Sequence, residues 1–464
     1  MLPPIESVIE QVIRDLKTPA GGSDRFASLE NILKNRQLFV ERCHETWKRL
    51  HHETLQRLFF FEGFLRREKT NPIGKTAKEY AEYHQAVIRR VNDSIIWSVF
   101  RLQRHVVKRF CLYKKRPSLL ESNPDSVYAS LRAFNANPMS LALWNDATSC
   151  VDIGDLTFVE NGMLPVPEFI ELKSGEVNAE IIELLNLNGE EHSRKFEEFR
   201  AKRAKAGVAQ YERVMRQHRT GEQALDLLTN ERGTDPVTGL ETSIVDIRVE
   251  QGSYDSEFGQ VLLKALAGHS EECELVAGCI WVYANADPSI NREQAALRFV
   301  NLLCGRISDE RQRSKRKPNS QDRDRVVPLI WGLHHPISLP LFLRNLGVDV
   351  IASTLCGDLR FKVMLYIDWN RFATLCNDAG ASFSLLGGKA VRRARSMQSN
   401  VRPPLVCGRL AQVNVEDVRM TVTDPSLVRM LFDGTTPQTV IQNMIAHAHL
   451  MMRDAGRGNS GDSN

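Results

Sequence analysis

The stretch from Ser149 to Gly175 constrains the fold of this chain most, because charged residues stand at the ends of two apolar, strand-like segments. It reads SCVDIGDLTFVENGMLPVPEFIELKSG, with Asp155 in the first segment and Glu171-Leu172-Lys173 closing the second. The turn residues Glu160-Asn161-Gly162 between the segments predict a hairpin. Charge within a paired and packed hairpin is costly unless another group compensates it. Two carboxylates and an ammonium at this place therefore indicate a site with its own chemistry.

The chain is long enough for two or three domains and has the composition of a soluble globular protein. It has 464 residues, of which 42% are hydrophobic and 25% are charged. The net charge of +4 is mild for this length. It neither requires nor excludes a nucleic-acid partner, so the local distribution of charge matters more than the sum.

Cysteine usage and the N-terminal sequence predict a cytoplasmic protein. The nine cysteines are scattered and form no C-x-x-C pair, which argues against a disulfide framework and a cysteine zinc site. The N-terminus MLPPIESVIEQVIRDL lacks the basic start and apolar core of a signal peptide. No apolar run reaches the length of about 18 residues that spans a membrane, so we expect no membrane association.

Periodicity and turn signals divide the chain into four parts. Apolar residues at three- and four-residue intervals predict a helical N-terminal region over 1–118. A mixed core follows over 119–290, interrupted by a charged helical insertion at about 178–240. Residues 291–453 read as an α/β region without an assigned role, and the composition of 454–464 is that of a disordered tail.

The predicted elements of the mixed core occur in a recognisable order. They are a helix at 125–146, which a break at Asn137-Pro138 could interrupt, strands at 150–159, 167–173 and 244–250, a helix at 255–268, and a strand at 275–284. This order, with the D…ExK residues, resembles the PD-(D/E)XK nuclease superfamily, the proteins with a restriction-endonuclease-like core. The resemblance covers about 160 residues. It implies a mixed α+β fold built on an αβββαβ core.

The resemblance implies a role for each residue of the motif. Asp155 and Glu171 match the metal-binding carboxylates, Lys173 matches the lysine, and Leu172 would add its backbone carbonyl. Residues two apart on a strand share a face, so Glu171 and Lys173 should project together. Mg²⁺ (or Mn²⁺) held there would polarise a phosphate and help ionise a water molecule. Lys173 would orient that water or stabilise charge in the transition state.

The chain departs from the superfamily pattern at the first helix, and other residues are weaker candidates. No glutamate occurs in 125–146, so Asp146 is the residue that would act in its place. Asp152 lies three residues before Asp155 and should face the other way in a regular strand. Some superfamily members carry a supporting glutamine on a later helix. Gln210 and Gln260 both fit that description, and the sequence does not separate them.

Two basic segments are candidate nucleic-acid contacts. Residues 101–116 hold seven lysines and arginines without an acid, and 389–402 hold five. On a helix, several basic residues of the first segment fall near one face and could follow a phosphate backbone. An ordinary solvated face is the competing interpretation. The candidates are Arg101, Arg104, Lys108, Arg109, Lys115, Arg392 and Arg393.

Several other enzyme classes lack their motifs. The histidines do not form H-E-x-x-H, Gly387-Gly388-Lys389 does not complete a phosphate-binding loop, and no G-x-S-x-G occurs. We therefore expect a metal-dependent nuclease acting on nucleic acid, DNA rather than RNA, in restriction, repair or defence against mobile elements. The alternative is a catalytically inactive nuclease-like protein that binds nucleic acid or a protein. A second copy of the chain or another protein would be a further partner.

Overall fold

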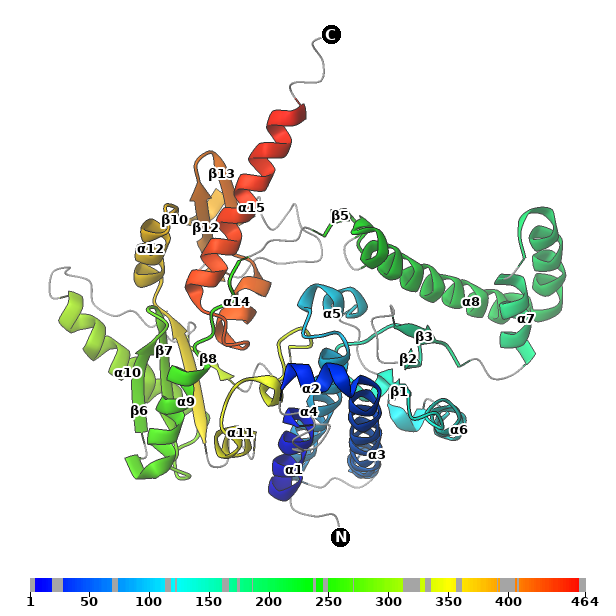
Figure 1. Cartoon of the computed structure of the whole chain (residues 1–464), viewed down its shortest axis with the longest axis horizontal. Helices are drawn as coiled ribbons and strands as arrows, with labels where there is room; N and C mark the ends of the chain where they lie inside the picture. The colour runs from blue at the N-terminus through cyan, green and yellow to red at the C-terminus, as the bar shows by residue number, and fades with distance from the viewer. Residues whose placement is uncertain are drawn as a thin grey trace. The chain divides into compact units, whose positions relative to one another are not determined.

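The computed structural model divides the chain into two compact units and describes most of its residues. One unit is Arg14–Val245, and the other comprises Met1–Ile13 with Asp246–Asn464. Both contain helices and small antiparallel sheets, so the fold class is α+β (Figure 1). The described residues are 5–18, 28–68, 74–112, 118–121, 123–160, 167–172, 176–185, 187–236, 239–244, 249–269, 271–311, 326–329, 335–355, 361–389, 391–392, 405–406 and 409–458.

The unit Arg14–Val245 is mostly helical and holds one three-stranded sheet. Its helices are α2 (Leu29–Lys34), α3 (Arg36–Glu68), α4 (Lys75–Val99), α5 (Arg104–Phe110), α6 (Pro124–Phe134), α7 (Glu176–Leu185) and α8 (Gly189–Asn230), with short helical turns η2 (Leu119–Glu121) and η3 (Asn145–Ala147). Its strands are β1 (Ser140–Trp144), β2 (Leu156–Glu160), β3 (Glu168–Ile170), β4 (Arg232–Thr234) and β5 (Glu241–Ser243).

The second unit holds two four-stranded sheets flanked by helices. The first sheet has the order β6-β7-β9-β8, and in the second β12 pairs with β10, β11 and β13. The strands are β6 (Glu271–Val276), β7 (Ile280–Asn285), β8 (Val327–Pro328), β9 (Lys362–Ile367), β10 (Ser382–Leu386), β11 (Leu405–Val406), β12 (Arg409–Val415) and β13 (Val418–Thr421). The helices are α9 (Asp255–Lys264), η4 (Ala265–His269), α10 (Arg292–Arg311), η7 (Leu341–Leu343), α11 (Val348–Leu355), α12 (Trp369–Asp378), α14 (Asp424–Leu431) and α15 (Pro437–Gly458), while α1 (Ile5–Lys17) crosses the unit boundary.

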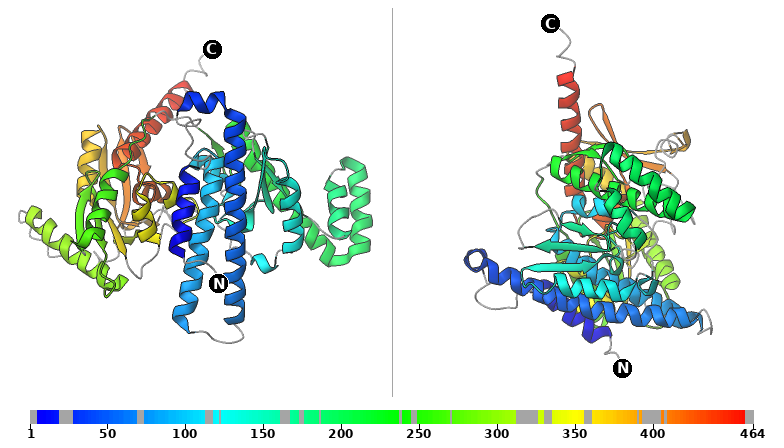
Figure 2. Two further views of the ribbon diagram at one scale, coloured as in Figure 1. Left: turned by 60° about the horizontal axis from the view of Figure 1, so that its bottom comes forward. Right: turned by 90° about the vertical axis from the view of Figure 1, so that its right-hand side faces the viewer.

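A long helical hairpin supports the three-stranded sheet. Helices α3 and α4 pack side by side (Figure 2), as the apolar spacing of the N-terminal region predicts. Leu55 and Leu58 of α3 and Ile88 of α4 join a buried cluster with Trp144 of β1 and Leu156 of β2. The hydrophobic effect therefore fixes the sheet against one face of this hairpin.

The helix expected over 125–146 is half helix and half strand. α6 ends at Phe134, and the next segment, SLALW, forms the fully buried strand β1. α6 ends next to Asn135, whose side-chain amide hydrogen-bonds the backbone of Ala142 in β1 as a neighbouring strand would. The Asn135 Oδ1 accepts from the Ala142 amide at 2.8 Å, and its Nδ2 donates to the Ala142 carbonyl at 3.1 Å. The helix is interrupted close to the break considered at Asn137-Pro138, and the expectation of helix beyond it was wrong because tertiary pairing outweighs local propensity.

The two predicted hairpin strands pair antiparallel in shorter form, while the predicted turn residues Asn161 and Gly162 lie outside the described residues. β2 begins at Leu156 rather than 150, and β3 ends at Ile170 rather than at 173. β2 lies between β1 and β3 and pairs antiparallel with both, with Leu156 opposite Trp144 on one side and Ile170 on the other. Residues 150–155 form an irregular loop instead of strand, because they are held by side chains of α4 and by α5.

Later predicted core elements differ from the expectation. Residues 275–284 are not one strand but parts of β6 and β7, joined by a turn in which Gly278 has φ +77°. β6 and β7 belong to the sheet β6-β7-β9-β8 and not to the sheet of Asp155. The predicted helix at 255–268 is present as α9 and η4. Of the predicted strand 244–250, residues 245–248 lie outside the described part, and 244, 249 and 250 are not in strands.

The charged insertion forms helices, and α8 turns back on itself. Tyr211 hydrogen-bonds His192 at 2.8 Å, and its ring centroid lies 4.7 Å from that of Phe196. In a straight helix, the 19 residues from His192 to Tyr211 would span about 28 Å. A bend between them therefore folds the first part of α8 against the second, around a small core that includes Ile181 of α7.

No described helix combines the length and the apolar character needed to cross a bilayer.

Candidate functional site

The structure brings Asp155 to the strand segment that carries Glu171. The Asp155 amide donates to the Ile170 carbonyl at 2.8 Å, and its Oδ2 accepts from the Leu172 amide at 2.5 Å. The Leu172 amide nitrogen is bonded directly to the carbonyl carbon of Glu171. Covalent geometry therefore puts the Glu171 Cα within about 5 Å of the Asp155 carboxylate. Two acids that are 16 residues apart in the sequence are neighbours here.

A local irregularity in the ladder aims the Asp155 side chain. Ile170 is opposite Leu156 in the register, yet its carbonyl also accepts from the Asp155 amide. Two residues of one strand thus oppose one residue of its partner, which is the arrangement of a β-bulge. Bulges redirect a side chain and are frequent beside active sites. In this case the Asp155 carboxylate is turned along the end of β3 rather than into the core.

Glu171 projects away from the core that supports the sheet. Ile170 and Leu172 both pack against the cluster of Leu156, Ala142 and Trp144. Successive side chains of an extended chain point to opposite faces, so Glu171 lies on the other face from its two neighbours. Its side chain is half-buried. A half-buried glutamate next to Asp155 supplies an oxygen donor of the kind that binds a hard cation.

Gly154 is required by the geometry just before Asp155. Its φ is +67°, a left-handed conformation that side chains with a Cβ disfavour. A Cβ at this position would come within 3.2 Å of the Ile170 carbonyl oxygen and of the Phe169 Cβ. The glycine therefore permits both the bulge and the close approach of β2 to β3.

Asn145 frames the loop that leads to Asp155. Its amide donates to the Asp155 carbonyl at 2.9 Å, and its Nδ2 donates to the Ile153 carbonyl at 2.8 Å. Its Oδ1 accepts from the Thr157 hydroxyl at 2.6 Å. Asn145 and Thr157 are fully buried, and their contacts fix the loop on both sides of Asp155.

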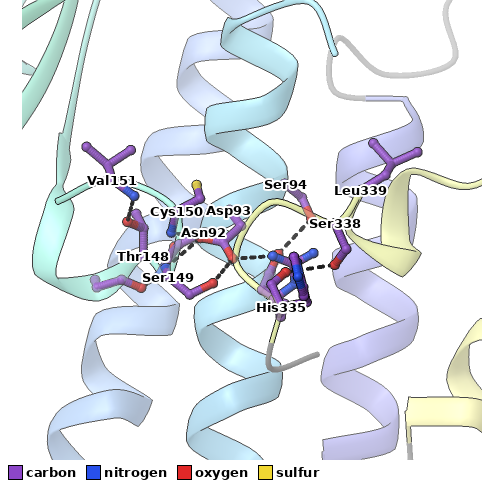
Figure 3. A network of polar contacts seen from close by, with 12 residues as sticks. Asn92, Asp93, Ser94, Thr148, Ser149, Cys150, Val151, His335, Ser338 and Leu339 are labelled. Atoms are coloured by element: carbon purple, nitrogen blue, oxygen red, sulfur yellow. Dashed lines mark hydrogen bonds and ion pairs between the residues drawn. The ribbon is translucent and has the colours of Figure 1, made fainter. Parts of the chain in front are cut away.

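A buried acid of α4 holds the first part of the same loop. Asp93 accepts from the Ser149 amide at 2.6 Å, from the Cys150 amide at 3.2 Å and from the Ser149 hydroxyl (Figure 3). Arg90 pairs with it at 2.8 Å, and both side chains are almost completely buried. A carboxylate that accepts several backbone hydrogen bonds and faces an arginine is compensated in the interior. Asp93 therefore has a structural role, which is to anchor residues 149–150.

His51 of α3 extends this support to the end of β1. Its Nε2 accepts from the Trp144 amide at 3.0 Å, so the proton must be on Nδ1, which faces the Asn92 Oδ1 at 3.0 Å. The Asn92 Nδ2 donates to the Ala147 carbonyl at 3.0 Å, which is consistent with this orientation. Burial, as the main cause, lowers the pKa of His51 to about 4. The neutral imidazole thus positions the strand end next to Asn145.

Asp146 lies at the same end of the sheet as Asp155, but on a different element from the expected one. It stands in the turn η3 after β1, and the neighbouring Asn145 amide bonds Asp155 directly. Arg89 of α4 donates to its carbonyl and also pairs with Glu62 at 3.1 Å. The placement on a first helix was therefore wrong, because the chain has already formed β1 at this point.

Asp152 fastens α5 to the loop. Its amide donates to the Phe110 carbonyl at 2.7 Å, and its Oδ2 accepts from the Leu112 amide at 2.5 Å. The Phe110 ring lies 4.5 Å from the ring of Phe169 in β3. These contacts give Asp152 a structural role and attach the basic segment of α5 to the strand that leads to Glu171.

The structure separates the basic candidates of the first segment. Arg109 is buried and paired with buried Asp235, so its charge is neutralised within the fold. The Arg104 guanidinium lies over the Trp97 ring at 5.7 Å and is half-buried. Arg101 is exposed in the turn before α5, and Lys108 is half-buried on α5. Only some of these residues are therefore placed to contact a ligand.

The remaining candidate residues differ in whether the structure describes them and in how exposed they are. Lys173, Lys115 and Arg393 lie outside the described residues, while Arg392 is exposed. Gln260 is exposed on α9, in the other compact unit. Gln210 is half-buried on α8, in the unit of Asp155.

α8 approaches the loop before Asp155 at Gly221, a position that the sequence analysis did not identify. A Cβ at Gly221 would lie 3.5 Å from the Cγ2 of Ile153. Gln217 is four residues earlier and therefore on the same helix face. Gln210 is 11 residues before Gly221, about 16 Å from it along a regular helix. Of Gln210 and Gln217, Gln217 is therefore nearer to the Asp155 loop along this helix, and helical periodicity counted from Gly221 is the sequence signal that could have identified it.

The donor set at this place is small. Among the described residues, no group of three or more histidines, cysteines or acids is arranged to hold a metal ion. Asp155 and Glu171 supply two carboxylates, which are hard oxygen donors of the kind that Mg²⁺ prefers. Mg²⁺ commonly binds through one or two carboxylates and completes its shell with water and substrate phosphate. The residues present therefore fit such an ion.

Neither models of protein families, nor curated protein sequences, nor solved structures show a match to this chain.

Proposed function

We propose that this chain is a metal-dependent nuclease of the PD-(D/E)XK type that hydrolyses phosphodiester bonds in nucleic acid, DNA rather than RNA. The observation that carries the proposal is the bulge that turns the Asp155 carboxylate to the backbone beside Glu171. The order of α6, β1, β2 and β3 is an αβββ order like the start of the proposed core, with β1, from within the predicted helix 125–146, as a strand in place of the predicted strand 244–250. Restriction, repair and defence against mobile elements remain the roles that such an activity would serve.

The chemistry assigned to each residue follows from its type and place. Asp155 and Glu171 would hold Mg²⁺ or Mn²⁺, with the Leu172 carbonyl as a further oxygen ligand. The ion supplies Lewis-acid polarisation of the phosphate and a lowered pKa for a bound water. Lys173 would carry positive charge next to the scissile phosphate and orient the attacking water. Leu172 packs into the core and so holds this end of the chain in place.

The decisive experiment compares variants that separate charge from structure. Asp155→Asn keeps an oxygen that accepts from the Leu172 amide, so the bulge should survive while the metal-binding charge is lost. Glu171→Gln removes the second charge, and Lys173→Gln removes the ammonium. Glu168→Gln is the matched control, because Glu168 is an exposed acid of the same strand, β3. Linear, circular and single-stranded DNA and RNA serve as substrates with Mg²⁺ or Mn²⁺.

We expect the wild type and Glu168→Gln to cleave, and EDTA to abolish cleavage. Each of the three site variants should lose at least about 100-fold in rate, since loss of groups that only support metal ligands already costs 10- to 100-fold. Unchanged melting temperatures would show that the loss is chemical. Equal activity of the wild type and all three site variants would refute the assignment of the site.

A second candidate is a nuclease-like protein that binds nucleic acid without cutting it. One contact favours it: the Asp155 Oδ2 accepts a hydrogen bond from the Leu172 amide at 2.5 Å, a structural use of the carboxylate. In that case the wild type would bind DNA or RNA but release no product with either metal. Asp155→Asn would then leave binding unchanged.

A further inference from the structure

Lys108 is a half-buried cation whose charged neighbours are also positive. Burial, then Arg109 and then Arg104, lower the pKa of Lys108. Within the described part of the chain, no carboxylate forms a hydrogen bond or an ion pair with its ammonium. Taking a cation partly out of water beside two like charges costs free energy, and a bound anion would offset that cost.

In the same helix, the charge of the neighbouring Arg109 is neutralised by a carboxylate. Arg109 is paired with Asp235, and both side chains are buried. Arg109 is therefore committed to the fold and is not available to a ligand. Lys108 and Arg104 are one helical turn apart, share a face of α5 and are both half-buried. The helix thus has an internally neutralised side and a side with uncompensated positive charge at Lys108.

α5 is attached both to the loop that leads to Asp155 and to β3, which precedes Glu171. Asp152 hydrogen-bonds the backbone at both Phe110 and Leu112, and the Phe110 ring packs at a tilt against the Phe169 ring of β3. Phe169 is two residues before Glu171, so the position of α5 is linked to that of the proposed catalytic residues. A polynucleotide with one phosphate at Glu171 would have further phosphates within a short distance of this helix.

We propose that Lys108, assisted by Arg104, anchors a phosphate of the nucleic-acid backbone next to the cleaved bond, without reading the base sequence. The assignment rests on the proposed function, because it takes a polynucleotide as the substrate. Lysine suits this task as a compact point charge, since it makes no bidentate contact with a base edge. The anchor therefore determines affinity and its salt dependence, and it leaves sequence preference unaffected.

The test is binding of fluorescein-labelled oligonucleotides of several sequences to the full chain in EDTA, measured by fluorescence anisotropy at several salt concentrations. The proteins are the wild type, Lys108→Gln, Lys108→Arg and the control Lys34→Gln. Lys34 is exposed and already paired with Glu30 at 2.6 Å, so its loss should not matter. Removal of Lys108 relieves repulsion and breaks no ion pair, so the variant should fold as the wild type does.

One phosphate contact contributes about 0.9 to the slope of log K against log salt. Lys108→Gln should therefore lower the slope by about 0.9 and weaken binding about eightfold at 0.1 M salt, equally for all sequences. Lys108→Arg should restore most of the affinity. Wild-type affinity and slope in Lys108→Gln would overturn the proposal, as would a loss confined to some sequences.

Further outcomes separate this proposal from the proposed function. Binding that depends on Lys108 without any cleavage in Mg²⁺ would remove the nuclease assignment and keep the anchor. If a Lys108→Gln variant cleaves and also binds as tightly as the wild type, the nuclease assignment stands and the phosphate anchor at Lys108 is refuted. Inorganic phosphate added at constant ionic strength should not displace the oligonucleotide. Displacement at millimolar phosphate would show a site for the free anion and would overturn the backbone assignment.

Discussion

Protonation of His51 should destabilise the unit that carries the candidate site. In the folded state, burial lowers the pKa of this imidazole to about 4, and its Nε2 accepts from the Trp144 amide. In the unfolded chain, the pKa should be near 6.5. Between these values the unfolded chain takes up a proton that the folded chain does not. The stability contributed by neutral His51 is therefore complete above about pH 6.5 and is lost as the pH falls toward 4.

The magnitude follows from the difference between the two pKa values. A difference of about 2.5 units corresponds to about 3.4 kcal/mol, of which about 2 kcal/mol is lost between pH 7.5 and pH 5. His51→Gln keeps a side-chain oxygen that can accept from the Trp144 amide and removes the titration. When the pH falls from 7.5 to 5, the free energy of unfolding should therefore decrease by about 2 kcal/mol more in the wild type than in the variant. Other titrating groups contribute equally to both proteins and cancel.

Two measurements check the reasoning. Urea unfolding of both proteins at pH 7.5 and pH 5 measures the change in their difference. A pH titration of protein labelled with ¹³C at histidine Cε1 follows the ring itself, since the resonance missing from His51→Gln belongs to His51. We expect that resonance to stay at its neutral position down to about pH 5. Titration near pH 6.5, or a stability difference that does not change with pH, would refute the argument.

The other predictions concern neighbouring contacts. Asp93→Asn leaves Arg90 buried with a neutral partner, and we expect it to lower the free energy of unfolding by about 3–5 kcal/mol in urea; a loss below about 1 kcal/mol would contradict the structural role of Asp93. Gly154→Ala places a Cβ 3.2 Å from the Ile170 carbonyl oxygen at a residue with φ +67°. We expect it to lower the free energy of unfolding by about 1–2 kcal/mol and to slow cleavage. An unchanged melting temperature and cleavage rate would count against the bulge. Asp235→Asn removes the partner of Arg109, so thermal unfolding should occur at a lower temperature while oligonucleotide binding stays as tight or becomes tighter; weaker binding would show that Asp235 orders the ligand site.

The sequence alone determined the features that depend on neighbouring residues. Apolar spacing identified the long helices α3 and α4, and the charged stretch after Gly175 proved helical in α7 and α8. Two apolar segments with turn residues between them predicted the antiparallel pairing of β2 with β3, and with it the closeness of Asp155 to the segment of Glu171. The metal, the substrate and the catalytic role of Lys173 stay predictions.

Only the tertiary structure decided the features that depend on partners far away in the chain. The segment 140–144 is a strand because Asn135 and β2 supply hydrogen bonds that local propensity does not reveal. Asp152 and Arg109 proved to be structural, because Leu112 and Asp235 are their partners. Asp93 and His51 support the loop from helices about 50 to 100 residues earlier. Residue type shows which chemistry a side chain is able to perform, whereas its partners in space determine whether that capacity remains available to a ligand.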